Sequence, residues 1–166
     1  MSRILQDEEI KDLITEEKIL PSNWQTRSRA RPKTNYTYSE RDLSLRSVSD
    51  RNFRVVLRTN QINLLDFSII LMFEDTDQTE YRLMRCNGLH PSRHTNKWEK
   101  ERGLPNSLFD PTFHIHQATE RYQLAGYAID GYAEPTEEYS SYDTALVVFL
   151  SRCGLSAPPS PQLVMF

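Results

Sequence analysis

The segment LLDFSIILMFEDTDQTEYRLMRCN, Leu64–Asn87, determines the fold expected for this chain. It begins with the most apolar run of the sequence and ends with a run of alternating apolar and polar residues, and a polar turn joins the two. So short a connection cannot hold the helical crossover that parallel strands require. The segment therefore predicts two antiparallel strands, the first of them central in a sheet.

The flanking sequence extends this pair into a meander. Further strands are expected at 43–48, 53–60 and 112–116, and amphipathic helices at 5–19 and 140–153. The expected fold is a single α+β domain over 1–166, in which an N-terminal and a C-terminal helix pack on an antiparallel meander of about five strands. Strict alternation along 81–87 would place Arg82 and Arg85 on opposite faces of this sheet.

Composition excludes several classes of protein. The chain has no apolar run long enough to span a membrane. Its N-terminus, MSRILQDEEIKDLI, lacks the features of a signal peptide, so a cytoplasmic location is expected. The two cysteines, Cys86 and Cys153, form no metal-binding motif and predict buried, reduced thiols. No serine or cysteine lies in an elbow-like turn beside a histidine, which argues against an acyl-enzyme hydrolase.

Charge is distributed unevenly along the chain. The net charge is only −3, yet basic residues gather at 27–58 and 82–102. The segment 23–39 is expected to be a basic arm, either flexible or a strand, and 156–166 a proline-rich C-terminal tail. Basic residues of this arm are candidates for contact with nucleic acid: Arg27, Arg29 and Arg31.

All four histidines of the chain fall in one short region. His114 and His116 lie two residues apart in an expected strand, so their side chains share one face while Phe113 and Ile115 face the core. The other two, in HPSRH (90–94), flank a long polar connection that is expected to be functional. The sequence predicts that these two halves meet at one end of the sheet.

Three interpretations of such a cluster remain open. The histidines could be structural, hydrogen-bonded groups. An HxH pair with a third imidazole could instead bind zinc, although Glu99, Asp110 and Glu120 complete no sharp ligand pattern. Without metal, one neutral and one charged imidazole could serve as base and acid in the cleavage of RNA through its own 2′-hydroxyl. That reaction also needs a cation to stabilise the charged phosphorane.

Two motifs resemble a known family. The strand ending Arg85-Cys86-Asn87 with His90, followed by the His114-x-His116 strand, resembles the histidine-rich TumE-like proteins of bacterial toxin–antitoxin loci and related families of mobile elements. In that family the first histidine cluster is a tandem pair and an aspartate precedes the asparagine, and neither feature is present here. The resemblance covers the middle and end of the chain. It implies a bacterial toxin–antitoxin or mobile-element protein that acts on RNA, with an antitoxin or another protein as partner.

These observations lead to one principal prediction and one rival. The principal prediction is a metal-independent ribonuclease without cofactor, in which His114 and His116 are the acid–base pair. The further site residues predicted are His90 and Arg85 in catalysis, and His94, Arg93, Thr119 and Arg121 in RNA binding. The rival is a non-enzymatic protein- or nucleic-acid-binding module of a defence or anti-defence system, in which the basic arm matters and the histidines do not.

Overall fold

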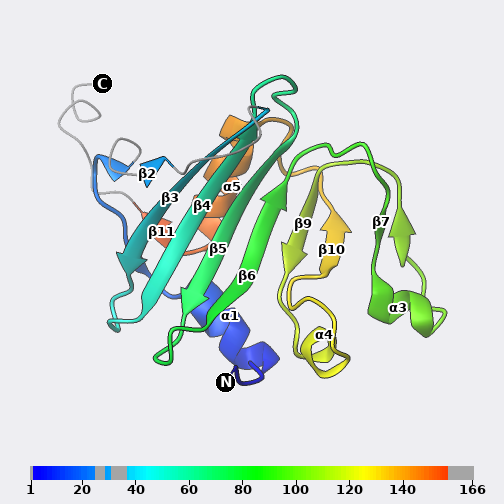
Figure 1. The fold of residues 1–166 in the computed structure, drawn as a ribbon, viewed down its shortest axis with the longest axis horizontal. Coiled ribbons are helices and arrows are strands. Elements are labelled where there is room, and N and C mark those ends of the chain that lie inside the picture. Colours follow the sequence, from blue (N-terminus) through cyan, green and yellow to red (C-terminus); the bar gives the residue numbers. More distant parts are fainter. Residues whose placement is uncertain (1, 25–28, 31–36, 157–166) are drawn as a thin grey trace.

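An antiparallel sheet whose strands follow one another in chain order forms the centre of the molecule (Figure 1). The computed structural model describes residues 2–24, 29–30 and 37–156, and over these the sheet has seven strands in the order β10-β9-β6-β5-β4-β3-β2. Every neighbouring pair of strands is antiparallel. The predicted α+β meander is therefore confirmed.

The strands agree with those expected from the sequence, with two additions. The five expected strands are β3 to β6 and β9. Strand β2 falls in 23–39, where a strand was one of two alternatives, and the edge strand β10 was not predicted. The sequence of β10, YAEP, is short and lacks alternation, so its pairing with β9 gives no local signal. The bounds are β2 Arg29–Ala30, β3 Tyr38–Arg46, β4 Asn52–Asn60, β5 Phe67–Glu74, β6 Glu80–Asn87, β9 His114–Gln117 and β10 Tyr132–Pro135.

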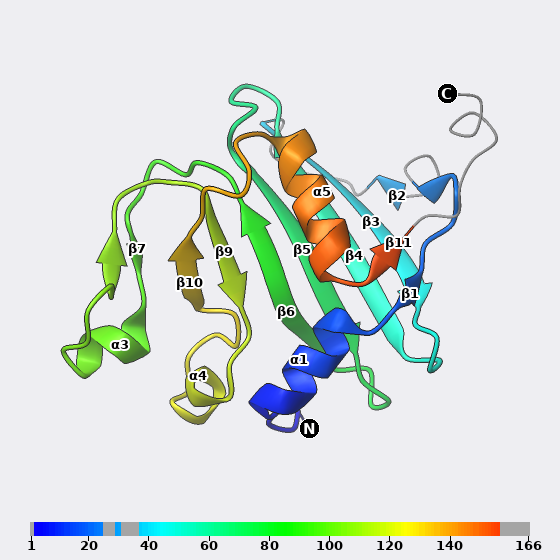
Figure 2. The ribbon, with the colours of Figure 1, turned by 180° about the vertical axis from the view of Figure 1, so that it is seen from behind.

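The two terminal helices, α1 (Asp7–Thr15) and α5 (Tyr142–Arg152), pack on one face of the sheet (Figure 2). Helix α1 is shorter than expected, because the chain then forms strand β1 (Lys18–Ile19) beside β11 (Leu155–Ser156). The interface is the hydrophobic core, to which α1, α5 and the strands contribute fully buried side chains: Leu13, Phe149, Leu71 and Leu83. Both cysteines are free and buried in it, as predicted.

Strand β6 contains a bulge that changes which way its arginines point. Met72 pairs with Arg82, whereas Ile70 pairs with Arg85, so the extra residue is accommodated between them. Because Ile70 and Met72 lie on the same face of β5, both arginines lie on the face opposite the helices. The prediction that Arg82 and Arg85 point to opposite faces is therefore wrong.

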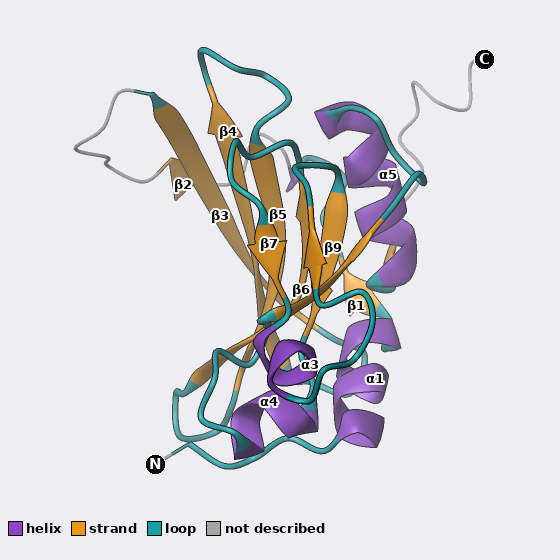
Figure 3. Cartoon of the chain, turned by 90° about the vertical axis from the view of Figure 1, so that its right-hand side faces the viewer, coloured by secondary structure: helices purple, strands orange, loops and turns teal. Residues whose placement is uncertain are grey.

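The face of β3 to β6 that carries these arginines is covered by neither terminal helix (Figure 3). Beyond β10, the connection 90–110 folds into its own hairpin of β7 (His94–Thr95), α3 (Lys97–Glu101) and β8 (Leu108–Phe109). Helix α4 (Glu120–Leu124) joins β9 to β10. None of the helices in the described part of the chain is long and apolar enough to cross a membrane. The tail beyond Ser156 lies outside the described residues.

Candidate functional site

The four imidazoles form one cluster at the end of β6 and β9. The His114 and His116 rings share one face of β9, with their centroids 5.0 Å apart. His94, on β7, lies 5.0 Å from His116 and 5.8 Å from His114. His90, in the loop after β6, lies 5.8 Å from His114. The two halves of the predicted cluster therefore meet, with His114 in contact with the other three rings.

A glycine brings His90 to its position. Gly88 ends β6 so close to the neighbouring chain that a Cβ atom there would lie 2.0 Å from the Leu65 carbonyl oxygen. The amides of Gly88 and Leu89 donate to the carbonyls of Phe67 and Leu65. This pairing directs His90 towards Asp66, and the His90 Nδ1 atom lies 2.5 Å from Asp66 Oδ1. The two atoms are close enough for an ion pair, although their alignment falls short of a hydrogen bond.

Asp66 is a buried carboxylate that neighbouring hydrogen-bond donors hold in place. Its Oδ2 atom accepts hydrogen bonds from the Tyr38 hydroxyl at 3.0 Å and from Asn60 Nδ2 at 3.2 Å. The His90 side chain is 31 % exposed, so this dyad combines a fixed carboxylate with an accessible imidazole. Sequence reasoning missed Asp66, although its position as the lone acid in the most apolar run was an available signal.

His94 is held by a buried asparagine. Its Nε2 atom lies 2.8 Å from Oδ1 of Asn96. Asn96 in turn pairs with the backbone of Ala133 in β10, accepting from its amide and donating to its carbonyl, both at 2.9 Å. These contacts dock the 90–110 connection on the edge of the sheet. Burial lowers the pKa of His94, so its ring is neutral near pH 7.

His114 and His116 are buried, with exposed fractions of 5 % and 4 %. Each Nδ1 atom is 2.7 Å from a backbone carbonyl, that of Thr112 for His114 and that of Asp130 for His116. Burial is the main cause that lowers the pKa of His114 to about 4 and that of His116 to about 2. Both rings are therefore neutral near pH 7 and difficult to protonate.

A histidine whose Nδ1 atom contacts a backbone carbonyl is also the arrangement found in metal sites. Within residues 2–24, 29–30 and 37–156, however, no group of three or more histidine, cysteine, aspartate or glutamate side chains is arranged to hold a metal ion. The zinc interpretation of the sequence gains no support from this geometry.

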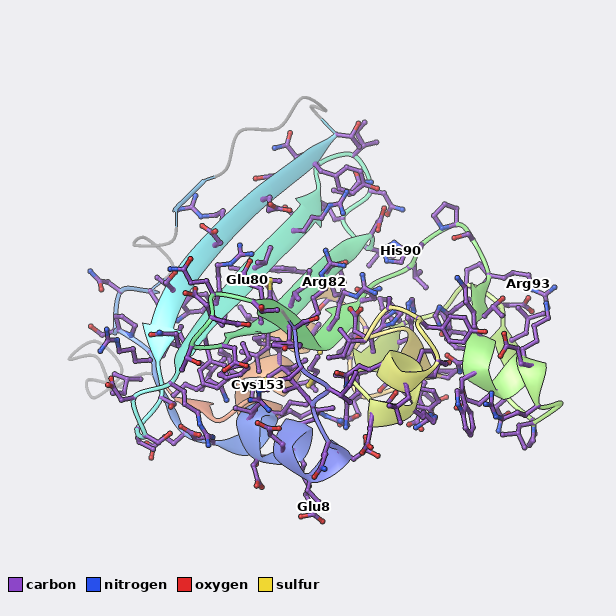
Figure 4. The ribbon with its side chains drawn as sticks, turned by 60° about the horizontal axis from the view of Figure 1, so that its bottom comes forward. Glu8, Glu80, Arg82, His90, Arg93 and Cys153 are labelled. Atoms are coloured by element: carbon purple, nitrogen blue, oxygen red, sulfur yellow. The ribbon has the colours of Figure 1, made fainter. Side chains whose placement is uncertain are left out.

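A groove runs along the uncovered face of the sheet, beside the histidine cluster. Three pockets of about 210, 180 and 430 Å³ form it. The first and second share Arg58 and Ser68, and the second and third share Arg82 and Arg85. His90 lines the first pocket, and His94 and His116 line the third. With Arg54 included, we call this the arginine groove (Arg54, Arg58, Arg82 and Arg85); Figure 4 shows Arg82 and His90 on the side of the sheet away from α1.

Buried polar atoms without a hydrogen bond gather in this groove. In the described part of the chain there are four such side-chain atoms: Arg58 Nε, Asp66 Oδ1, Arg85 Nε and Asp130 Oδ2. All four residues line the groove. Two of these atoms do lie near an opposite charge. Asp66 Oδ1 faces His90, and Asp130 Oδ2 lies 3.4 Å from a terminal nitrogen of Arg85. Unsatisfied buried groups are costly and rare in native proteins, so their concentration here makes the groove a candidate binding site.

The other predicted site residues are divided between two places. Arg93 lines the third pocket and pairs with Asp110. Thr119 and Arg121 instead line a different pocket, with Ile115 and Gln117 on the opposite face of β9 from the histidines. Thr119 caps α4 and Arg121 binds Glu99, so both lie away from the histidine cluster, and their role in RNA binding stays a prediction.

Only one of the three candidate arginines of the basic arm lies within the described residues. Arg27 and Arg31 lie outside the described residues. Arg29 belongs to β2, where its backbone pairs with Asp42 of β3 at the edge of the sheet.

Comparisons with known protein families, with curated proteins and with solved structures found no match for this chain. The resemblance to TumE-like proteins therefore stays a prediction from short motifs.

We expect the fold to lose stability as the pH falls from 6.5 to 5. The folded state keeps His114 and His116 neutral because their pKa values are about 4 and about 2. The unfolded chain binds a proton at each of them below about pH 6.5. The unfolded state then holds more protons, so the free energy of unfolding should fall by about 1–2 kcal/mol per histidine by pH 5.

Urea unfolding measured at pH 7.5, 6 and 5 tests this expectation. The lowered pKa values of Glu16 and Glu99 affect stability only below about pH 4.5, outside this range. The double variant His114→Gln/His116→Gln should lose most of the pH dependence. An equal slope in the variant and the wild type would contradict the assignment.

Proposed function

We propose that the protein is a metal-independent ribonuclease that cleaves RNA by transphosphorylation at the histidine cluster. The observation that carries this proposal is the convergence of four imidazoles near Arg85, beside a basic groove. The cleavage of RNA by its own 2′-hydroxyl requires a base, an acid and a cation, and the site supplies all three types of group.

The burial of the site supports a different division of roles from the one predicted on the sequence. His114 and His116 are buried and neutral, which suits them to orient their neighbours. His94 is neutral and half-buried. Because its Nε2 atom donates to Oδ1 of Asn96, its Nδ1 atom is the one that would accept the proton of the 2′-hydroxyl. His90, accessible and facing the Asp66 carboxylate, is suited to donate a proton to the leaving group.

The reaction conserves atoms and electrons. The 2′-oxygen bonds to phosphorus as its proton passes to His94, and the bond from phosphorus to the 5′-oxygen breaks as His90 donates a proton to that oxygen. Arg85 would stabilise the negative charge on the phosphorane. The products are a 2′,3′-cyclic phosphate and a 5′-hydroxyl. His94 then loses its extra proton to water and His90 regains one from water, which restores the enzyme.

Product analysis tests this proposal directly. Purified protein without a histidine tag should cleave single-stranded RNA in excess chelator, and mass spectrometry should find 2′,3′-cyclic phosphate ends. DNA of the same sequence should remain intact, because it lacks the 2′-hydroxyl. Cleavage that chelator abolishes, or products with 5′-phosphates, would contradict the mechanism.

A second candidate is a non-enzymatic nucleic-acid-binding module. The observation that favours it is the burial of His114 and His116, because two of the four imidazoles then have little contact with the water or substrate with which they would exchange protons. It predicts tight binding of RNA with no cleavage in the same assay. Either function is compatible with a cytoplasmic toxin–antitoxin or mobile-element protein whose activity a cognate antitoxin would restrain, and this setting is part of the proposal.

A further inference from the structure

Apart from Arg85, the arginine groove carries positive charge that the histidine chemistry does not use. Its three pockets are lined by six cationic and three anionic side chains, whereas the whole chain has a net charge of −3. The groove is therefore a basic surface on an acidic protein, which favours an anionic ligand. The cations are Arg54, Arg58, Arg82, Arg85, Arg93 and Lys97.

Three of the four groove arginines have hydrogen-bonding capacity to spare. Arg82 is exposed, and no carboxylate of the described residues forms an ion pair with it. Arg58 and Arg85 each hold a buried Nε atom without a hydrogen-bond partner. A phosphate oxygen is an acceptor that would satisfy such donors. These three side chains are therefore suited to follow a phosphodiester backbone.

Arg54 has a different role. It binds Glu80 at 2.8 Å and Asp42 at 3.0 Å, so its charge is already compensated. This network joins β3, β4 and β6 at the wall of the groove. Arg54 consequently shapes the site rather than offering a free cation.

Aromatic rings accompany these cations. The Arg58 guanidinium lies 4.3 Å from the ring centroid of Tyr38, and the half-buried ring of Tyr127 lines the third pocket. A basic groove with aromatic side chains is the surface that binds single-stranded nucleic acid, whose unpaired bases can stack on such rings. A duplex of RNA would instead hold its bases paired and stacked, with a major groove too deep and narrow for side chains to read.

We infer that a single strand of RNA lies along the arginine groove, with its phosphates on Arg58, Arg82 and Arg85, and that its path runs beside the histidine cluster. The class of substrate rests on the proposed function, whereas the binding path does not require cleavage. This assignment differs from the arm of Arg27, Arg29 and Arg31 that the sequence suggested. It makes the uncovered face of the sheet the substrate-binding surface.

Binding of an RNA that cannot be cleaved tests the path separately from catalysis. The probe is a fluorescent single strand of about 12 nucleotides, which spans one typical binding site, with 2′-O-methyl groups that block the attacking oxygen. We expect Arg82→Glu to weaken binding about tenfold and to lower the slope of log affinity against log salt by about 0.7, one phosphate contact for a single strand. Arg58→Gln should also weaken binding of this RNA and lower the salt slope.

Lys11→Glu is the matched control, because it makes the same change in charge at an exposed position of α1, on the opposite face of the sheet. It should leave affinity and salt slope unchanged. Any of four results would overturn the path. Lys11→Glu could weaken binding as much as Arg82→Glu, or Arg82→Glu could leave binding unaltered. A duplex of the same sequence could bind more tightly, or the wild type could bind no RNA. Groove-dependent binding without any cleavage of unmodified RNA would keep the path and reject the ribonuclease.

Discussion

His90→Gln should lower the rate of RNA cleavage by about 10²–10⁴-fold, the contribution typical of a general acid or base. Glutamine keeps much of the size and polarity of histidine but cannot transfer a proton near neutral pH. The effect should be large because His90 is the accessible imidazole that also faces a buried carboxylate, Asp66. Initial rates on single-stranded RNA in chelator measure it. Asp66→Asn should lower the rate by a similar factor, because it keeps the shape of the site but no longer holds the proton of His90 on Nδ1.

The fold of the variant is the necessary control. His90 is 31 % exposed and makes no core contact, so the Tm of His90→Gln should stay within a few degrees of the wild type. Binding of the 2′-O-methyl RNA should also persist, which separates lost chemistry from lost affinity. A fully active His90→Gln, together with an inactive and stable His116→Gln, would return the acid–base role to β9 as the sequence predicted.

Lys18→Met should lower the free energy of unfolding by about 3 kcal/mol, the largest effect on stability that we expect from a single substitution. Lys18 is 1 % exposed, and its Nζ atom donates to the carbonyls of Leu13, Ile14, Glu16 and Cys153, each at 2.8 Å. It therefore joins the C-terminal ends of α1 and α5, where backbone carbonyls lack partners within the helix. Methionine fills the space but leaves several buried carbonyls without a donor, each at a cost of about 1–3 kcal/mol.

Thermal and urea unfolding measure the loss, which corresponds to a fall in Tm of about 6–12 °C for a chain of this size. Lys11→Met makes the same substitution at an exposed position of the same helix and should change stability by less than about 0.5 kcal/mol. Equal stability of the two variants would show that the four carbonyl contacts contribute nothing. Gly154 supports the assignment, because a Cβ atom there would lie 2.4 Å from the Glu16 carbonyl oxygen and separate the two helix ends.

Much of the architecture could be predicted from the sequence because its signals are local. The alternation of Phe53, Val55 and Leu57 identified the core face of β4, and these residues are buried in the core. The same reasoning placed His114 and His116 on one face of β9 and Ile115 on the other. Alternation failed in β6, because the bulge depends on pairing with β5 and has no local mark.

Some parts of the site could not be predicted, because they depend on contacts between distant segments. Asp66 reaches His90, and Asn96 reaches Ala133, through the folding of loops rather than through any spacing in the chain. The groove itself joins side chains of β4, β5 and β6, and two of its arginines share a face only because of the bulge.

The sequence by itself determined the meander of β3 to β6, the two covering helices and the grouping of four histidines, since hydrophobic period and residue spacing act within a few residues. Only the tertiary structure decided which histidines are available for chemistry. The protonation of an imidazole depends on how much water and which charges surround it. The spacing of His114 and His116 in the sequence would be the same if both side chains were exposed. Packing nevertheless buries both, and it leaves His90 accessible beside Asp66.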